Sequence, residues 1–436
     1  MRLRVLILLI ASLSFINGEV TESSLCEDSD EYLDMTDRGL QRIEKEFLQN
    51  SSYSCINLSG NGITEVEEGA LESMTKLQYL NLTGNKLSLQ FLSTYGHPTV
   101  KVLVLDEAFA DIHLPKHRNK GIFLPILLKF PRLKHLYLRR NKFERIMIPS
   151  WSCSFPQITH LYLDDNRLQS TSFLTTLPAT LTHLYLRNNS LTVFTSGSLD
   201  NLKVLNVDHN NLQVIGKNEC RRQRIYLKSA INLEKLSLFN NLLYQVEEGA
   251  MENLTNLKYL DLSDNFLWNI PPRAFQNLSS LLDLKLNKNN LTSVPNLCNL
   301  HKLKSLHLGD NAIEYIKRET FCNLRHLRYV DLSYNAITRI ESSAFDMMRS
   351  LTTLDLSWNY IETFSRVGLT RTNYRLEDSI NVYLDMANCS LQRLTEYFLH
   401  HSFYICIDLS GNNIQEVEES TIGSMTKIIM VKSGWK

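Results

Sequence analysis

One four-residue phrase, H-L-Y-L, occurs three times between residues 135 and 186. The histidine and tyrosine of each copy alternate with leucines, the period-two pattern of a half-buried β-strand, so both rings should point to one solvent-facing side. If the three strands lie side by side at about 4.8 Å, the histidines form one column and the tyrosines a parallel one. Aromatic and polar surfaces of this kind favour recognition of a macromolecule. The candidate ligand-binding residues here are His135, His160 and His183, Tyr137, Tyr162 and Tyr185, and the flanking Arg139 and Arg187, with Asp164 between them.

Two alternatives compete with this binding surface. Duplication of one repeat into its neighbours would produce the same phrase without any function. A column of histidine-bound metal ions is the second alternative, and it is disfavoured because no acidic or cysteine ligand stands at a matching position. No metal site is therefore expected.

Acidic residues take the tyrosine position in later strands. Asp261, Asp331 and Asp355 each stand between two aliphatic residues, so they should lie on the same solvent-facing side. An acidic face favours a basic or mixed-charge protein partner through electrostatic steering. These three aspartates are therefore further candidate ligand-binding residues.

The sequence does not favour catalysis. It contains no G-x-S-x-G, H-E-x-x-H or P-loop motif, and the outward carboxylates stand on an open strand surface rather than in a dry pocket. Histidines and cysteines show no zinc-site spacing. Lys and Arg together number 46, as do Asp and Glu, so the basic excess typical of nucleic-acid binding is missing. We expect a non-enzyme without a cofactor and without a nucleic-acid partner.

The strands that carry these side chains belong to a repeat. Between Leu257 and Ile361 the phrase L-x-x-L-x-L-x-x-N-x-L recurs, with its asparagine at positions 265, 289, 311, 335 and 359. A period of roughly 20–29 residues with this pattern is that of a leucine-rich repeat. Each repeat is too small to bury its own apolar face, so neighbours must stack. The predicted fold is an α/β leucine-rich-repeat solenoid (horseshoe) with a parallel concave sheet, in which the asparagine amide satisfies backbone groups of the turn.

Other apolar positions of the repeat predict the rest of the core. Phe275, Phe321 and Phe345 recur on the returning segment and should stack as a hydrophobic spine. Cys26 and Cys55 flank the first repeat and are predicted to tie an N-terminal cap. Cys298 and Cys322 occupy the same position in adjacent repeats, where a disulfide and two buried thiols are equally compatible with the sequence. Cys153 and Cys220 have no assigned partner.

The N-terminus predicts export. Arg2 and Arg4 precede the apolar run from Val5 to Ile16, which is typical of a signal peptide and short for a membrane anchor. No later stretch is apolar enough to span a bilayer, so we predict a secreted, extracellular protein. Eight N-x-S/T sites suit glycosylation. They are Asn50, Asn57, Asn81, Asn188, Asn253, Asn277, Asn290 and Asn388.

Two insertions interrupt the repeats, and each carries a basic cluster that could grip sulfated glycans. Solvated loop charges without a ligand are the competing explanation. The clusters are Lys116, His117, Arg118 and Lys120 in the first insertion, and Arg221, Arg222 and Arg224 in the second.

The N-terminal segment appears a second time near the end of the chain. The stretch from Tyr383 matches the stretch from Tyr32 without a gap, including the phrases LQR, EVEE and SMTK, and Cys406 falls on Cys55. Cys389 is the nearest candidate partner of Cys406. The copy breaks off, which predicts either truncation or an uncapped edge around residues 428–431 through which copies of the chain could pair as a homo-oligomer. The predicted organisation is residues 1–18 signal peptide, 19–54 cap and first coil, 55–364 repeats, 365–382 connector and 383–436 truncated duplicate.

These repeats resemble the extracellular leucine-rich-repeat family that includes Toll-like receptor ectodomains, chaoptin-like proteins and the acid-labile subunit of insulin-like growth factor complexes. The resemblance covers nearly the whole chain after the signal peptide. The sequence lacks two features of that family, the cysteine-rich C-terminal cap and a transmembrane segment with a signalling domain. The resemblance implies a soluble protein that binds a protein or glycan ligand, in innate immune recognition or, alternatively, in cell adhesion and matrix organisation.

Overall fold

The computed structural model describes residues 26, 31–45, 47–49, 51–109, 122–123, 129–147, 157–195, 197, 200–217, 223–364, 382–394, 404–418 and 430–432. The chain divides into two compact units. Unit 1 comprises Met1–Pro115, Phe123–Asn141 and Trp151–Ile158, and unit 2 comprises Lys116–Ile122, Lys142–Ser150 and Thr159–Lys436.

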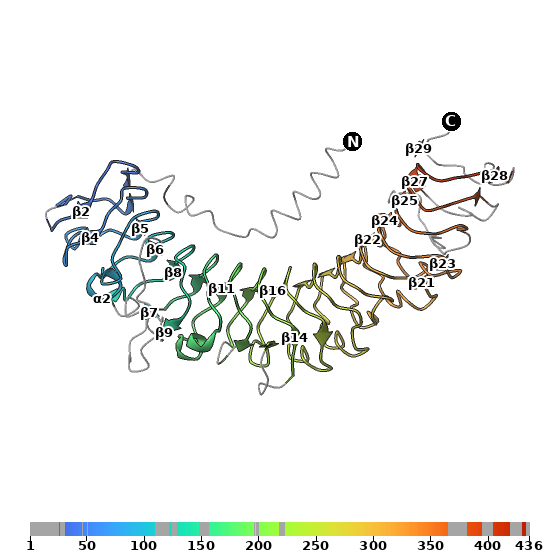
Figure 1. The fold of residues 1–436 in the computed structure, drawn as a ribbon, viewed down its shortest axis with the longest axis horizontal. Coiled ribbons are helices and arrows are strands. Elements are labelled where there is room, and N and C mark those ends of the chain that lie inside the picture. Colours follow the sequence, from blue (N-terminus) through green and yellow to red (C-terminus); the bar gives the residue numbers. More distant parts are fainter. Residues whose placement is uncertain are drawn as a thin grey trace. The chain divides into compact units, whose positions relative to one another are not determined.

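Unit 1 is built on short parallel strands that pair in chain order. The register sets Cys55 beside Tyr79 and Tyr79 beside Val102, so equivalent repeat positions face each other. The strands are β1 (Tyr32–Asp34), β3 (Cys55–Asn57), β5 (Tyr79–Asn81), β6 (Val102–Val104) and β8 (His135–Tyr137), with β2 (Arg42–Ile43), β4 (Glu65–Val66) and the helical turn α2 (Phe91–Thr94) on the returning segments (Figure 1). The short strand β7 (Ile122–Phe123) contains the boundary between the two units.

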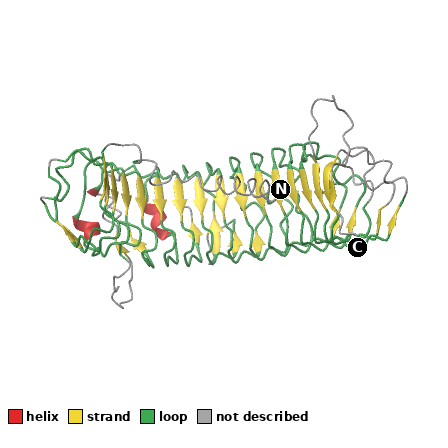
Figure 2. Cartoon of the chain, turned by 90° about the horizontal axis from the view of Figure 1, so that it is seen from above, coloured by secondary structure: helices red, strands yellow, loops and turns green. Residues whose placement is uncertain are grey.

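Unit 2 repeats the same construction over a longer stretch, and its strands stand side by side in one row (Figure 2). They are β10 (His160–Tyr162), β11 (His183–Tyr185), β13 (Val204–Asn206), β16 (Lys235–Ser237), β18 (Tyr259–Asp261), β19 (Asp283–Lys285), β20 (Ser305–His307), β22 (Tyr329–Asp331), β24 (Thr353–Asp355), β25 (Val382–Asp385), β27 (Tyr404–Asp408) and β29 (Met430–Lys432). The returning segments hold β9 (Ile146–Met147), η2 (Ser172–Thr176), β12 (Phe194–Thr195), β14 (Val214–Ile215), β15 (Arg224–Tyr226), β17 (Gln245–Val246), β21 (Tyr315–Ile316), β23 (Arg339–Ile340), β26 (Arg393–Leu394) and β28 (Glu416–Val417).

The core confirms the predicted solenoid, with very little helix among the described residues. The central leucines of the strands, such as Leu260 and Leu284, are fully buried, while the residues on either side of them face outward. The predicted spine is confirmed as well, since Phe275, Phe321 and Phe345 are at most 2% exposed and the last two rings stack at 5.6 Å.

Disulfides join two pairs of cysteines among the described residues. Cys26 and Cys55 are bonded across the first coil, with Cα atoms 6.1 Å apart. Cys298 and Cys322 are bonded between adjacent coils, with Cα atoms 5.2 Å apart, so the bridge is the alternative that the structure adopts. Cys153 and Cys220 and the side chain of Cys406 lie outside the described part of the chain.

The turn asparagines form a ladder along each unit. The Asn265 amide donates to the carbonyls of Leu238 (3.0 Å) in the preceding coil and Leu262 (3.1 Å) in its own, and its oxygen accepts the Leu243 N–H (3.0 Å). Asn289 and the later asparagines repeat the arrangement one coil at a time. Because each amide bonds to two coils, the ladder sets the register between neighbours and leaves no buried turn group unpaired in these positions.

Three described coils lack the asparagine, and the structure compensates in different ways. Where Arg38 replaces it in the first coil, the Arg38 N–H donates to the Asn61 amide oxygen of the next coil (2.8 Å). Where Ala108 replaces it, the Leu87 N–H donates to the Ala108 carbonyl (3.0 Å) instead of to a side chain. Where Cys389 replaces it, the buried thiol lies 2.9 Å from the Leu356 carbonyl, and it is the one free cysteine among the described residues. The predicted pairing of Cys389 with Cys406 therefore gives way to a structural role for the Cys389 thiol.

The duplicated segment continues the sheet of unit 2 in register, because Thr353 pairs with Tyr383 and Asp355 with Asp385. The shared LQR and EVEE phrases have a physical explanation in cross-coil ion pairs. Arg42 reaches Glu65 (3.5 Å) and Glu67 (2.9 Å) in the first copy. In the second copy Arg393 makes the matching pairs with Glu416 (3.1 Å) and Glu418 (3.2 Å).

The ladder generates the first prediction. Asn265→Ala leaves the buried Leu243 N–H without its partner and removes one of the two amide bonds at each of the Leu238 and Leu262 carbonyls. The free energy of unfolding should therefore fall by about 2 kcal/mol in urea titrations followed by circular dichroism. Asn256→Ala is the matched control, since this exposed amide makes a single bond to the Ile231 carbonyl. Equal losses in the two variants would contradict a special role for the ladder.

Candidate ligand-binding surface

Strands β10 and β11 bring two of the predicted histidine–tyrosine pairs together in unit 2. The register sets His160 beside His183 and Tyr162 beside Tyr185. The histidine rings stack at 4.0 Å and 11°, and the tyrosine rings at 4.7 Å and 3°. Each of these imidazoles lies with Nδ1 2.8 Å from the hydroxyl of the preceding threonine. Two parallel columns therefore exist on this pair of strands.

The third pair belongs to unit 1. The Arg139 guanidinium lies 5.0 Å from the centre of the Tyr137 ring, and Arg139 Nε lies 3.9 Å from the Asp106 carboxylate. Burial lowers the pKa of His135, with the neighbouring Lys134 charge as a second cause, so the imidazole is neutral at neutral pH. Asp106 belongs to the preceding coil and also accepts the Arg139 N–H (2.6 Å), so Arg139 is held by two contacts to that coil.

Burial differs strongly among the predicted contact residues. The Tyr137 and Tyr162 side chains are only 3% and 4% exposed, whereas His160, His183 and Tyr185 are half-buried and Arg187 is exposed. Asp164 accepts the Arg187 N–H at 2.7 Å and so shapes the turn after the strand. A ligand would therefore meet the histidine edges, Tyr185 and Arg187 rather than the faces of all three tyrosines.

The three predicted aspartates lie in the expected strands and also stabilise the turns that follow. The Asp331 carboxylate accepts the Ser333 N–H (2.9 Å) and hydroxyl (2.6 Å), and Asp355 does the same with Ser357. Asp261 is 6% exposed and accepts the Tyr259 hydroxyl at 2.9 Å. Burial raises the pKa of Asp331, and it raises the pKa of Asp355 to about 6. The acidic character of this face is therefore weaker below neutral pH.

A network of charged and aromatic side chains fills the sheet face between these positions, and the sequence analysis did not single it out. Lys235 and Lys285 place their ammonium groups 5.4 and 5.2 Å from the Tyr259 ring, on opposite neighbouring strands. Lys285 also lies 3.8 Å from Asp261. The sequence did contain a signal for this network, namely the charged residues that alternate in sign at the outward positions of β16, β18 and β19.

Asp283 and His307 complete this network. His307 Nε2 lies 3.7 Å from Asp283 Oδ1 and 3.0 Å from the Ser305 hydroxyl. Burial raises the pKa of Asp283 to about 6, although the Lys285 charge opposes the shift. Burial lowers the pKa of His307 to about 3, and Lys285 lowers it further. At neutral pH the imidazole is therefore uncharged, and Asp283 gains its proton on mild acidification.

The large exposed aromatic side chains lie elsewhere, just after or before the turn asparagines, and sequence analysis missed them. Side patch A consists of Leu242, Tyr244, Phe266 and Trp268, which are 39%, 45%, 56% and 63% exposed. Side patch B consists of Tyr334, Trp358 and Tyr360, which are 54%, 51% and 61% exposed.

Side patch B also carries backbone strain. Tyr334 and Trp358 adopt φ values of +51° and +57° directly before the turn asparagine, a position where Glu107, Arg140, His209 and Lys288 of other coils also have positive φ. Bulky residues rarely occupy this left-handed region. Their rings stack at 5.3 Å and 9°. An aromatic residue directly before the turn asparagine was the signal in the sequence.

The described glycosylation candidates differ in how their amides are engaged. Asn253 and Asn277 donate to the carbonyls of Lys228 (3.0 Å) and Glu252 (2.8 Å), and Asn188 donates to Asp165 (2.8 Å). Asn57 and Asn81 pair directly in register on neighbouring strands. Asn388 lies in a left-handed turn position, and Asn50 falls outside the described residues. The Asn290 side chain is exposed and makes no hydrogen bond to the described part of the chain.

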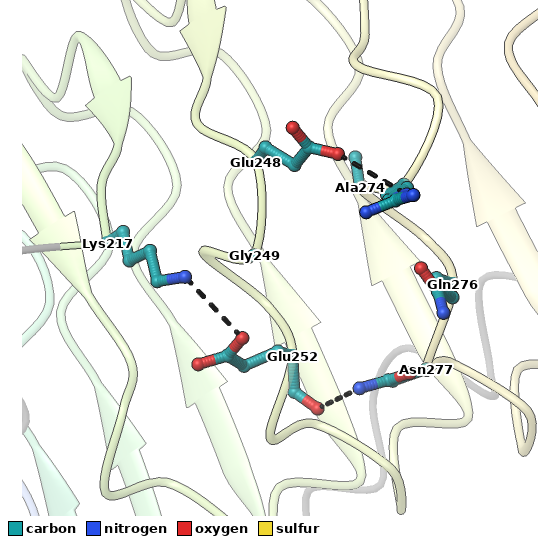
Figure 3. A pocket seen from close by; sticks show the side chains of 8 residues that line it. Lys217, Glu248, Gly249, Glu252, Ala274, Gln276 and Asn277 are labelled. Carbon is teal, nitrogen blue, oxygen red and sulfur yellow. Dashed lines mark hydrogen bonds and ion pairs between the residues drawn. The ribbon is translucent and has the colours of Figure 1, made fainter.

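One depression on the returning side of unit 2 is lined by Lys217, Glu248, Gly249, Glu252, Arg273, Ala274, Gln276 and Asn277, with a cavity volume of about 420 Å³ (Figure 3). Its charges are already paired, since Lys217 lies 3.8 Å from Glu252 and Arg273 lies 3.8 Å from Glu248. The depression is open and polar, so it offers no dry site for chemistry.

The prediction of a basic cluster in the second insertion is wrong for one of its three residues. Arg224 lies in β15, is 9% exposed and forms an ion pair with Glu247, so it is not available to a sulfated glycan. Lys116, His117, Arg118, Lys120, Arg221 and Arg222 lie outside the described residues. Across the described ranges, no group of three His, Cys, Asp or Glu side chains could hold a metal ion, and no helix is long and apolar enough to cross a membrane.

Family comparisons agree with this architecture. One leucine-rich-repeat model matches residues 31–87, 231–291, 255–313 and 301–361, and a second matches residues 180–202. The chain is a leucine-rich-repeat protein. No curated protein matches its sequence.

Among solved structures, this leucine-rich-repeat protein is similar to the Toll–Spatzle complex of Drosophila, with 20% identity and a TM-score of 0.67 over 92% of this chain and 57% of that one. It is also similar to the TLR13–ssRNA13 complex, with 19% identity and a TM-score of 0.50 over 88% of this chain and 66% of that one. The chain thus spans less than two thirds of the length of either structure. Identities at this level show a shared fold.

The charged network generates a pH prediction. The folded leucine-rich-repeat protein keeps His307 neutral while the unfolded chain takes up a proton below about pH 6.5, so this histidine makes stability fall as the pH drops from 6.5. His307→Gln should therefore reduce the Tm loss between pH 7 and pH 5, by the equivalent of about 1 kcal/mol.

Asp283→Asn should act in the opposite sense. The Asp283 pKa is raised to about 6, so the wild-type carboxyl favours the folded state increasingly as the pH falls from 6 towards 4. The variant loses this gain and should show a larger Tm loss on acidification, measured by scanning calorimetry. Identical pH slopes for both variants and the wild type would reject the predicted titrations.

Proposed function

We propose that this chain is a secreted, non-catalytic leucine-rich-repeat protein that binds a macromolecular ligand through the concave face of its sheet, in innate immune recognition. The observation that carries the proposal is the register of unit 2, which aligns the outward side chains of successive strands into one continuous face. Stacked rings and alternating charges on such a face suit a large surface rather than a small substrate.

The similar structures support a binding role by analogy of fold. Toll is bound to Spatzle in one of them, and TLR13 is bound to a single-stranded RNA in the other. The present chain balances 46 basic with 46 acidic residues, which favours a protein or glycan ligand over RNA. A single-stranded RNA probe is therefore a useful negative control.

Extracellular matrix organisation or cell adhesion is the alternative function. It rests on the basic residues of the two insertions other than Arg224, which is buried and paired with Glu247. If this alternative holds, the secreted protein should be retained on a heparin column and released at modest salt, and Arg118→Ala with Lys120→Ala should abolish retention. Passage of the wild-type protein through the column in low salt would reject the sulfated-glycan ligand.

The concave-face proposal is tested with variants chosen from the exposed positions. The secreted chain is used as bait against microbial material and host surface proteins, and affinity for the captured ligand is then measured by biolayer interferometry. His183→Ala with Arg187→Ala should weaken binding by about tenfold, because His183 belongs to the histidine column, Arg187 follows the tyrosine column in β11, and neither is part of the core.

Replacement of all three column tyrosines would test the fold as well as the ligand, since Tyr137 and Tyr162 are almost fully buried. Tyr185→Ala alone is the better third variant. Tyr334→Ser with Trp358→Ser is the matched control on side patch B. If the concave-face variants keep their affinity and the side patch B variant loses it, the concave-face proposal is rejected and the binding site lies on the side of the solenoid.

A further inference from the structure

We propose that Asn290 carries an N-linked glycan whose inner sugars lie against Phe266 and Trp268 and cover side patch A. The proposal rests on the proposed secretion, because the sugar donor is found in the secretory pathway. It assigns an occupant to the most exposed aromatic side chain among the described residues, Trp268.

The register between coils places the attachment point directly beside the aromatic rings. The Asn290 N–H donates to the Leu267 carbonyl at 2.8 Å, so Asn290 lies level with the residue between Phe266 and Trp268. Leu267 is buried, whereas its two neighbours Phe266 and Trp268 are exposed, as is Asn290. Adjacent coils are separated by about 4.8 Å, which is within reach of the first sugar of an attached glycan.

The same ladder extends the apolar surface away from Asn290. The Phe266 N–H donates to the Leu243 carbonyl at 2.8 Å, which sets Phe266 level with the residue between Leu242 and Tyr244. Side patch A thus continues over two coils as one apolar surface. Contiguous exposed apolar surface of this kind marks contact sites.

The other side of Asn290 leaves room for a bulky group. The Ala312 N–H donates to the Leu291 carbonyl at 2.9 Å, so an alanine occupies the equivalent position in the following coil. The Asn290 amide is exposed and is not used by the described part of the chain, unlike those of Asn253 and Asn277. The triplet Asn290-Leu291-Thr292 is a complete acceptor sequence.

The attachment step forms a bond between Asn290 Nδ2 and C1 of the terminal N-acetylglucosamine of a lipid-pyrophosphate-linked oligosaccharide. The amide loses one proton, and the lipid pyrophosphate leaves with the electron pair of the broken sugar–phosphate bond. The sugar ring presents an apolar face of C–H groups, which packs on the electron-rich faces of aromatic rings. Polar hydroxyl groups on its other edges then face water in place of Trp268.

The experiment uses the full chain secreted from a glycosylating eukaryotic cell. Glycopeptide mass spectrometry should find Asn290 occupied. Thr292→Ala removes the acceptor sequence without touching the rings, and it should lower the Tm by about 2 °C and raise the acrylamide quenching of the Trp268 fluorescence, identified by difference from Trp268→Phe.

Thr255→Ala is the matched control, because Asn253-Leu254-Thr255 is the same triplet and its amide is bonded to Lys228 instead. This control should leave the quenching unchanged. In a Trp268→Ser background the Tm loss from Thr292→Ala should be smaller, which separates packing on the ring from a general effect of the sugar. Trimming the folded wild-type protein with an endoglycosidase gives the same comparison without a sequence change.

A bare Asn290 in a protein whose other acceptor sites are occupied would overturn this inference and leave the proposed function standing. Occupancy with unchanged quenching in Thr292→Ala would overturn the packing. Failure of the chain to enter the secretory pathway would overturn the proposed function and this inference together.

Discussion

Every coil of this protein must turn its backbone sharply inside a packed interior, and the turn can exist only if its buried polar groups are paired. The asparagine ladder meets this constraint with one side chain per coil. Asn265 and its equivalents donate to two coils and accept from one, so the turn and the spacing between coils are stabilised by the same amide.

The chemistry of the outward face follows from that constraint. Once the ladder sets the register, outward residues of successive strands become neighbours. Charged and aromatic side chains from different coils then come into contact. Lys285 reaches both Tyr259 and Asp261 in the preceding strand, and His307 reaches Asp283 in the same manner. Partial burial in this crowded row shifts the pKa values of Asp283 and His307 in opposite senses, because desolvation disfavours the charged form of each.

The duplicated segment shows how far local contacts explain sequence identity. Arg42 and Arg393 make equivalent ion pairs with the two glutamates of the following coil, although their side chains are about half exposed. Exposed pairs of this kind contribute little to stability. The repeated LQR and EVEE phrases therefore agree with a common origin of the two copies, while the buried Asn61 and the half-buried Asn412 make the same turn contact in both.

The sequence by itself determined the period, the parallel strands, the phenylalanine spine and which strand positions face outward, because all of these depend on apolar residues at fixed local spacing. Tertiary structure alone decided how exposed each outward side chain is. Tyr162 is 4% exposed and Trp268 is 63% exposed, a difference that comes from residues one coil away rather than from either local phrase. The same reason explains why Arg224 is paired with Glu247 and why Asn290 stands beside two aromatic rings. The repeat phrase aligns the strands of neighbouring coils, but the exposure and the contacts of each side chain depend on the size and path of the side chains and loops in the adjacent coils, which the phrase does not specify.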